Sequence, residues 1–254
     1  RLDADSEITG LNIYKQELSN GTATLNLDTS AGDLSGLGQI GSTAVSSFMD
    51  VVNITGGGTF STSNYFRAVT TNLADNTTFE MNGDWFYGDM IGSSGVNTVT
   101  FNDGSVIAPS ATLSLLGGDD VVTLNGDVSL LGDSLDFGAG DDILNVIGDA
   151  QTPGFRTNVD MDGGANATPT GDRILVNRDA GSVVWGVDSA ISNFEEINIT
   201  GGTVIFYNDA TLTNVPSIVV NNSSSQLAFR NDAGVSSGTV DLQSGSLVSF
   251  DRAG

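Results

Sequence analysis

Three segments, Gly95-Val-Asn-Thr-Val-Thr-Phe-Asn-Asp103, Gly118-Asp-Asp-Val-Val-Thr-Leu-Asn-Gly-Asp127 and Gly140-Asp-Asp-Ile-Leu-Asn-Val-Ile-Gly-Asp149, are copies of one phrase. The glycines that open them are 23 and then 22 residues apart, and a fourth copy, Gly171 to Asn177, follows after 31. Each copy is a turn followed by a short β-branched run. A repeat of this length predicts a solenoid, because one copy cannot bury its own apolar face and neighbouring copies must stack.

Alternating strand patterns separated by Gly, Asn, Asp and Ser continue on both sides of these copies, for example at 22–27, 217–220 and 246–250. The connections are too short for crossover helices, so successive coils should pair in parallel, with the right-handed connection that such units adopt. We therefore predict an all-β fold, a single right-handed parallel β-helix over residues 1–254 with coils of about 22 residues. Residues 1–20 are a candidate N-terminal cap.

The long step before the fourth copy adds nine residues to the usual 22. Insertions into repeats map to loops on one face of a solenoid, often the face that binds a partner. We therefore predict a protruding loop at 150–170, with Phe155 and Arg156 as binding candidates and the stretch from Asp149 to Gly171 as the first choice of contact. The alternative is a surface loop with no function.

The composition is strongly acidic. Thirty-one Asp and Glu residues stand against eight Lys and Arg residues, which gives a net charge of −23. Such a surface repels nucleic acid and anionic membranes, and favours either solubility alone or a cationic partner. No apolar run approaches the length of a membrane span, so we expect no direct membrane insertion in this fragment.

Two residue types are missing from the chain. Without histidine there is no Ser-His or Cys-His catalysis, and the commonest metal ligand is lost. Without cysteine the chain cannot belong to the small disulfide-stapled secreted class. Arg1 to Asp5 is not a signal peptide, and Asp251 to Gly254 carries no capping signal, so we expect a leader to have been removed or this chain to be an excised fragment.

The phrases Phe194-Glu-Glu-Ile-Asn-Ile-Thr-Gly-Gly202 and Gly140-Asp-Asp-Ile-Leu144 resemble the passenger domains of Gram-negative autotransporters, which belong to the type V secretion class. The low lysine content and the acidity are also similar to that family. The family's C-terminal membrane barrel and the Gly-Asp-Ser-Gly motif of its protease subgroup are absent here. The resemblance implies a β-helix that is secreted or displayed on the outer membrane surface, acting as an adhesin or virulence factor. The implied partner is a host-cell receptor, a matrix component or a glycan.

A second resemblance concerns metal binding. Phe137 to Leu144 is similar to one calcium-binding repeat of the RTX type, which makes Asp119, Asp120, Asp141 and Asp142 candidate calcium ligands. True sites of that type need tandem nine-residue repeats, and these copies lie 22 apart.

Aligning the copies by their glycines gives an alternative to a metal site. That alignment places Asn97, Asp120, Asp142 and Arg173 in one column, where the arginine would neutralise the stacked aspartates. We therefore predict no obligatory cofactor, with calcium as the alternative.

The densest aromatic cluster is Trp85-Phe86-Tyr87. Exposed, it would bind a sugar face or a receptor; buried, it would be a core stack, and strand alternation requires at least one ring to point inward. Both readings remain open from the sequence, and the three residues are kept as binding candidates.

The predicted function is non-catalytic binding. The stretch Gly118-Asp119-Asp120 raises an enzymatic alternative, because pectin-degrading β-helix hydrolases use aspartates on neighbouring coils as acid and base. The histidine and lysine motifs that accompany them in that family have no counterpart here, since the chain has no histidine and Lys15 is the only lysine. We therefore expect no enzymatic activity. The alternatives are a carbohydrate-active hydrolase or lyase, and a structural stalk.

Overall fold

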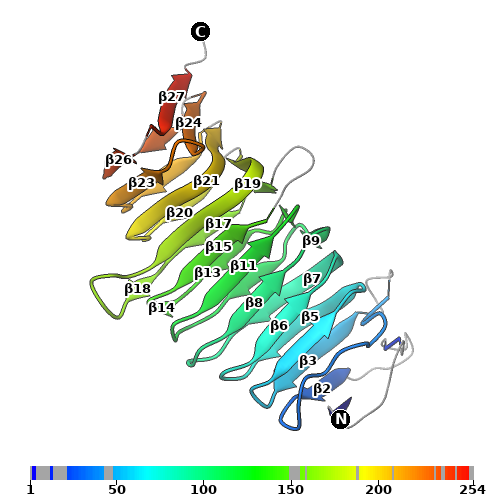
Figure 1. The fold of residues 1–254 in the computed structure, drawn as a ribbon. Helices are drawn as coiled ribbons and strands as arrows, with labels where there is room; N and C mark the ends of the chain where they lie inside the picture. Colours follow the sequence, from blue (N-terminus) through cyan, green and yellow to red (C-terminus); the bar gives the residue numbers. More distant parts are fainter. Residues whose placement is uncertain are drawn as a thin grey trace.

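The fold is a parallel β-helix, seen in a computed structural model that describes residues 2–3, 12–13, 22–42, 48–148, 155–157, 159–186, 189–207, 209–231, 233–235, 238–243 and 245–251. Of these, the side chains at 2–3, 155–157, 179–181, 234–235 and 251 are outside the description. The coils follow one another in chain order along one axis, with the two ends of the chain at opposite ends of the stack (Figure 1). This confirms the predicted fold class.

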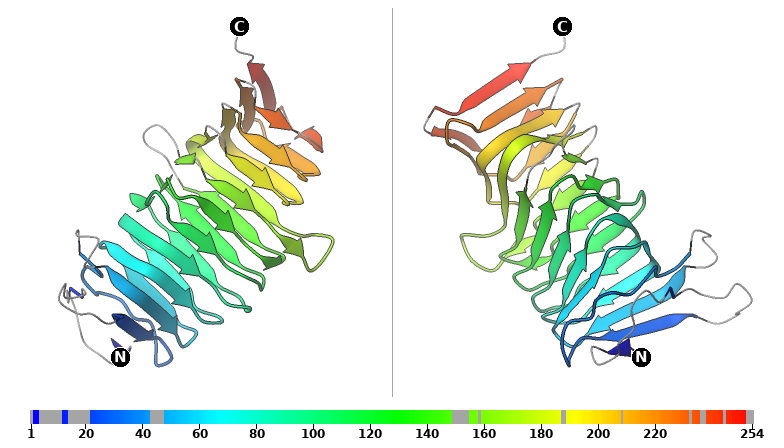
Figure 2. Two further views of the ribbon diagram at one scale, coloured as in Figure 1. Left: turned by 180° about the vertical axis from the view of Figure 1, so that it is seen from behind. Right: turned by 45° about the vertical axis from the view of Figure 1, so that its right-hand side comes forward.

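Each coil passes through three columns of parallel strands, which we call faces 1, 2 and 3; Figure 2 shows the stack from two further sides. Face 1 consists of β1 (Leu2–Asp3), β2 (Thr24–Asp28), β3 (Met49–Thr55), the second halves of β5 (Phe66–Leu73) and β7 (Asp84–Ile91), β10 (Thr112–Ser114), β13 (Ser134–Asp136), β17 (Asp160–Asp162), β20 (Ala190–Ser192), β22 (Thr211–Thr213) and β25 (Gly234–Val235).

Face 2 consists of β4 (Thr59–Thr62), β6 (Thr78–Met81), β8 (Thr98–Phe101), β11 (Val121–Asn125), β15 (Ile143–Ile147), the first halves of β19 (Arg173–Trp185) and β21 (Glu196–Tyr207), β23 (Ser217–Asn221) and β26 (Thr239–Gln243). Face 3 consists of the first halves of β5 and β7, β9 (Ser105–Ile107), β12 (Ser129–Leu130), β16 (Phe155–Thr157), the second halves of β19 and β21, β24 (Gln226–Arg230) and β27 (Leu247–Asp251). A short pair, β14 (Ala139–Gly140) with β18 (Ala165–Asn166), lies at one corner.

The core is made of side chains that repeat at the same inward position in every coil. Successive residues of a strand point to opposite faces, so an apolar residue at every second position fills the interior. On the N-terminal coils five fully buried phenylalanines pack with ring centroids 5.4–6.1 Å apart: Phe60, Phe66, Phe79, Phe86 and Phe101. Towards the C-terminus Trp185, Phe206 and Phe229 stack in register.

Outward-facing asparagines reinforce the stack. The amide of Asn53 donates to Asn26 Oδ1 over 2.7 Å, and Asn72 donates to Asn53 Oδ1 over 2.8 Å. The same chain of amide hydrogen bonds recurs on face 2, where Asn125 donates to Asn102 Oδ1 over 2.9 Å. An asparagine can both donate and accept, so a column of them is satisfied from coil to coil.

The segment at 150–170 is more than one loop. It contains β16, which continues face 3, β17, which continues face 1, and β18, which pairs with β14 at the corner. The residues at 150–154 and 158 lie outside the described part. The step between paired residues is 26 from Ala139 to Ala165 and 30 from Ile143 to Arg173, so extra residues enter after β18 as well as before β16. The candidate cap at 1–20 also lies largely outside the described residues.

The ring cluster makes a direct test of the core. Phe79 is fully buried and its ring contacts those of Phe60, Phe66, Phe86 and Phe101. We expect Phe79→Ala to lower the free energy of unfolding by about 3–5 kcal/mol, because it removes a buried ring and leaves a cavity. Urea denaturation measures this.

The matched control is Val96→Ala, at an exposed apolar position of the same region. It should change the free energy of unfolding by less than about 0.5 kcal/mol. Equal losses in the two variants would contradict the assignment of the core.

Candidate functional site

A column of polar side chains lies inside the corner that leads into face 2. The strand register places Asn97, Asp120, Asp142 and Asp172 over one another in successive coils, and Glu195 follows on the next coil. The first four side chains have no exposed surface. We call these five residues the acidic column.

The same alternation that builds the core directs these residues inward. Asp120 lies an even number of residues before Val122 and Leu124, so its side chain points to the same, inward side as theirs. Asp142 stands in the same relation to Leu144 and Val146, and all these side chains are buried. This signal was present in the sequence. Two of the four candidate calcium ligands, Asp120 and Asp142, are therefore buried inside the solenoid and do not lie in a solvated turn.

Each aspartate of the acidic column holds the main chain of the coil before it. Asp120 Oδ1 accepts the Asn97 N–H over 2.5 Å, Asp142 Oδ1 accepts the Asp120 N–H over 2.6 Å, and Asp172 Oδ1 accepts the Asp142 N–H over 2.7 Å. Glu195 Oε2 completes the series by accepting the Asp172 N–H over 2.7 Å. These bonds satisfy main-chain donors at the corner, where the ladder between strands has not yet begun.

The second carboxyl oxygen of each buried aspartate has no partner. Oδ2 of Asp120, Asp142 and Asp172 is buried and makes no hydrogen bond. At Asp172 this oxygen lies close to the backbone of Gly163, where a Cβ would come within 2.8 Å of it. An ionised carboxylate without a partner for one oxygen is costly to bury, so protonation is the cheaper state.

The pKa values follow from this burial. Desolvation raises the pKa of Asp120 to about 8, against a lowering effect of the hydrogen bond from Asn97, and the charges of Asp142 and Asp119 raise it further. Desolvation likewise raises the pKa of Asp142 to about 7 and that of Asp172 to about 6. Near neutral pH the column therefore contains protonated aspartates.

The other two calcium candidates are on the outside of the same turns. Asp119 Oδ1 accepts the Asp141 N–H over 3.0 Å, and Asp141 Oδ1 accepts the N–H groups of Ala167 and Thr168 over 3.0 and 2.8 Å. The hydroxyl of Thr168 also donates to Asp141 Oδ2, and these bonds lower the pKa of Asp141. Asp141 therefore fastens the loop after β18 to the body of the solenoid.

The predicted position of Arg173 is wrong by one residue. Ile143 pairs with Arg173, so Asp172 stands above Asp142 and the column gains a third aspartate in place of a neutralising cation. The physical reason is that the core sets the register: Ile174 and Val176 must follow Leu144 and Val146 on the inward side, whatever the position of the glycine.

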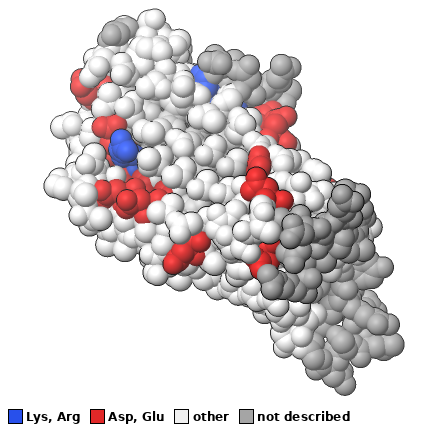
Figure 3. All heavy atoms as spheres, turned by 60° about the horizontal axis from the view of Figure 1, so that its bottom comes forward, with Lys and Arg blue, Asp and Glu red and all other residues white. Residues whose placement is uncertain are grey.

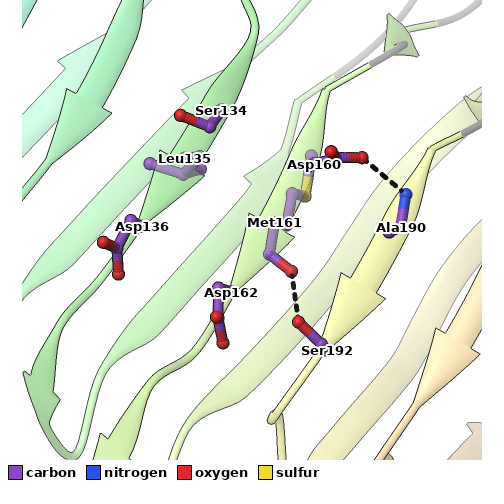
Figure 4. A pocket seen from close by; sticks show the side chains of 8 residues that line it. All are labelled: Ser134, Leu135, Asp136, Asp160, Met161, Asp162, Ala190 and Ser192. Carbon is purple, nitrogen blue, oxygen red and sulfur yellow. Dashed lines mark hydrogen bonds between the residues drawn. The ribbon is translucent and has the colours of Figure 1, made fainter.

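A groove of about 370 Å³ lies on the outer side of face 1, across β13, β17 and β20 (Figure 4). Its floor is the main chain of Leu135 and Met161, whose side chains are buried in the core, and Asp136, Asp160 and Asp162 line it together with Ser134, Ala190 and Ser192. We call it the acidic groove.

One oxygen of each carboxylate in the groove accepts a hydrogen bond from a main-chain N–H. The donors are Gly138 for Asp136, Ala190 for Asp160 and Gly164 for Asp162. The groove is not evident from the sequence, because Asp136 meets Asp160 and Asp162 only through the pairing of β13 with β17.

Strand alternation separates the aromatic binding candidates into one buried residue and two partly exposed residues. Phe86 is fully buried in the ring cluster, whereas Trp85 and Tyr87 lie partly exposed on the outer side of face 3, their rings stacked at 5.6 Å. Phe155 and Arg156 are in β16, where Arg156 pairs with Ser129, but their side chains are outside the described part of the structure.

Acidic side chains form separate groups on the face shown in Figure 3, with few basic residues among them. Among the described residues no group of three or more acidic side chains is arranged to hold a metal ion, and no helix there is long and apolar enough to cross a membrane.

Compared with known proteins, the chain matches no family model, no curated protein sequence and no solved structure. The autotransporter and RTX resemblances therefore remain predictions.

The acidic column makes folding depend on pH. In the folded state these aspartates keep their protons to about pH 6–8, while in the unfolded chain they lose them near 3.8, so stability falls as the pH rises through this window. We expect Asp142→Asn to remove about 1.4 kcal/mol per pH unit of this decline between about pH 4 and 7. Thermal melting from pH 4 to pH 9 measures it.

Asp119→Asn is the matched control, since it removes a carboxyl group from an exposed position in the neighbouring turn. It should leave most of the pH dependence of the wild type in place, because the charge of Asp119 is the smallest of the causes that set the pKa of Asp120. Parallel curves for Asp142→Asn and the wild type would show that Asp142 ionises normally in the folded chain.

Calcium is expected to add no stability. Asp120 and Asp142 are committed to main-chain donors inside the column, and Asp119 and Asp141 to donors of the next coil or loop. Chelated protein should melt at the same temperature with and without millimolar calcium, with magnesium as the control for ionic strength. A rise of several degrees with calcium alone would contradict this.

Proposed function

We propose that this chain is a non-catalytic binding protein that recognises a basic protein partner through the acidic groove. Its setting is a surface-displayed or secreted β-helix of a Gram-negative bacterium, of the autotransporter-adhesin kind, and the partner is a host-cell receptor or matrix protein. The observation that carries the proposal is the groove itself: a hollow of about 370 Å³ lined by three carboxylates on a lateral face of the solenoid.

The chemistry of the acidic groove fits a lysine or arginine side chain. The carboxylates of Asp136 and Asp162 lie side by side on paired strands, where they suit the cationic head, and the groove of about 370 Å³ has room for the stem. The oxygens that bond to main-chain N–H groups hold these carboxylates in place before the partner arrives.

The rest of the molecule supports this role. A net charge of −23 attracts a basic partner over long range and raises the rate of encounter. A stack of coils also offers broad lateral faces, and a protein interface of standard size needs about 800 Å² on each partner. The central strand of the groove, β17, lies within the 150–170 segment where the sequence predicts an insertion.

Two competing functions receive less support. The Asp119–Asp120 pair cannot act together on a polysaccharide, because Asp120 has no exposed surface. A uniform stalk does not account for the groove or for the longer coil around 150–170.

The test is binding to an immobilised peptide of alternating arginine and apolar residues, followed by binding to cultured host cells. We expect the triple variant Asp136→Asn, Asp160→Asn and Asp162→Asn to lose at least about tenfold in affinity, because the charged acceptors are removed while the oxygens that hold the main chain remain. Wild-type affinity should fall with added salt.

The matched control is the triple variant Asp33→Asn, Asp75→Asn and Asp103→Asn. These aspartates are exposed and each accepts one main-chain N–H, so the control loses the same charge and keeps the same bonds. Equal weakening by the two triple variants would reduce the effect to net charge and refute the groove. Cleavage of polygalacturonate by the purified chain would refute non-catalytic function.

A further inference from the structure

A block of aromatic side chains surrounds one arginine on the outer side of face 3. Phe66 pairs with Phe86 and Arg67 with Tyr87, so Tyr65 and Trp85 are the neighbours just before them. The guanidinium carbon of Arg67 lies 4.0 Å from the ring centre of Tyr65 and 4.8 Å from that of Tyr87. Trp85 stacks on Tyr87 on one side. We call Tyr65, Arg67, Trp85 and Tyr87 the aromatic cage.

Arg67 has no anionic partner in the described structure. Its side chain is 5% exposed, its Nη1 is buried without a hydrogen bond, and no carboxylate forms an ion pair with it. This is unusual in a chain with 31 acidic residues, because a buried guanidinium is normally paired or hydrogen-bonded. The cage therefore holds a cation whose charge no described carboxylate offsets, and an anion seated over the cage would be attracted to it.

The backbone is shaped around the cage. The register of β5 against β7 slips between Arg67 and Thr70, which is a bulge, and bulges commonly redirect side chains beside functional sites. Opposite it, Gly88 has φ +88°, and a Cβ there would lie 1.7 Å from the carbonyl oxygen of Ala68. Only glycine permits this close approach, which brings the strand carrying Tyr87 against the strand carrying Arg67.

We propose that the aromatic cage binds a saccharide that carries a carboxylate on a pyranose ring. The charge of Arg67, held just beneath the surface between two tyrosine rings, attracts the carboxylate, and the partly exposed rings of Trp85 and Tyr87 pack against the C–H face of the sugar. The inference extends the proposed binding function to a second ligand class, on a different face and with opposite charge to the partner of the acidic groove.

The charge of the whole chain distinguishes this site from the groove. A net charge of −23 repels an anionic sugar at long range, while the attraction to the guanidinium just beneath the surface acts over a short range and is poorly screened. Added salt should therefore leave sugar binding unchanged or strengthen it, whereas it weakens the binding of the arginine peptide at the groove.

The experiment is saturation-transfer NMR and calorimetry of the full chain with glucuronate and with N-acetylneuraminate. Glucose serves as the neutral sugar and sulfate as the anion without a ring. We expect binding of one or both acidic sugars and none of glucose or sulfate. Arg67→Gln and Trp85→Ala should each weaken binding at least about tenfold.

Arg230→Gln and Tyr207→Ala are the matched controls, since they alter an exposed arginine and an exposed tyrosine on the same face outside the cage. Both should bind the sugar as the wild type does. If Arg67→Gln unfolds, Trp85→Ala, at a partly exposed position, carries the test alone. No binding of either acidic sugar, equal binding of glucose or sulfate, or unchanged binding in Trp85→Ala would overturn the inference. Binding of the arginine peptide at the acidic groove is measured separately, so failure of the cage inference and failure of the proposed function can be told apart.

Discussion

The stacking of main-chain hydrogen bonds from coil to coil is the constraint on which this structure depends. A parallel ladder fixes the register of each coil on the one before it, and the two-residue period of the strand then decides which side chains enter a closed interior. Leu144 and Val146 enter by this rule, and so does Asp142, whatever its chemistry. The acidic column is the direct consequence.

Because of this constraint, the acidic residues of the chain fall into an exposed group and a buried group. Most carboxylates face water and give the chain its charge, but those of Asp120, Asp142 and Asp172 are held where only their protonated forms are easily accommodated. They cap main-chain donors at a corner, as Asn97 does at the head of the column without any charge. Three aspartates in place of asparagines make the middle of the solenoid sensitive to pH.

The sequence was enough for the fold and insufficient for the sites. Repeated glycines and β-branched runs predicted the parallel coils, because a period of 22 residues leaves few other ways to bury an apolar face. Aligning by glycine misplaced Arg173, since the core and not the turn sets the register. The acidic groove joins Asp136 to Asp162, and the aromatic cage joins Arg67 to Tyr87, through pairings between coils that no local pattern reveals.

The most direct test of this account is a titration of the side-chain carboxyl carbons by NMR in aspartate-labelled protein, with Asp120, Asp142 and Asp172 assigned by substitution to asparagine. We expect midpoints of about 8, 7 and 6 for these three residues, well above the usual value for an aspartate. Midpoints near 4 for all three would mean that the column is ionised and hydrated at neutral pH, and would contradict the account.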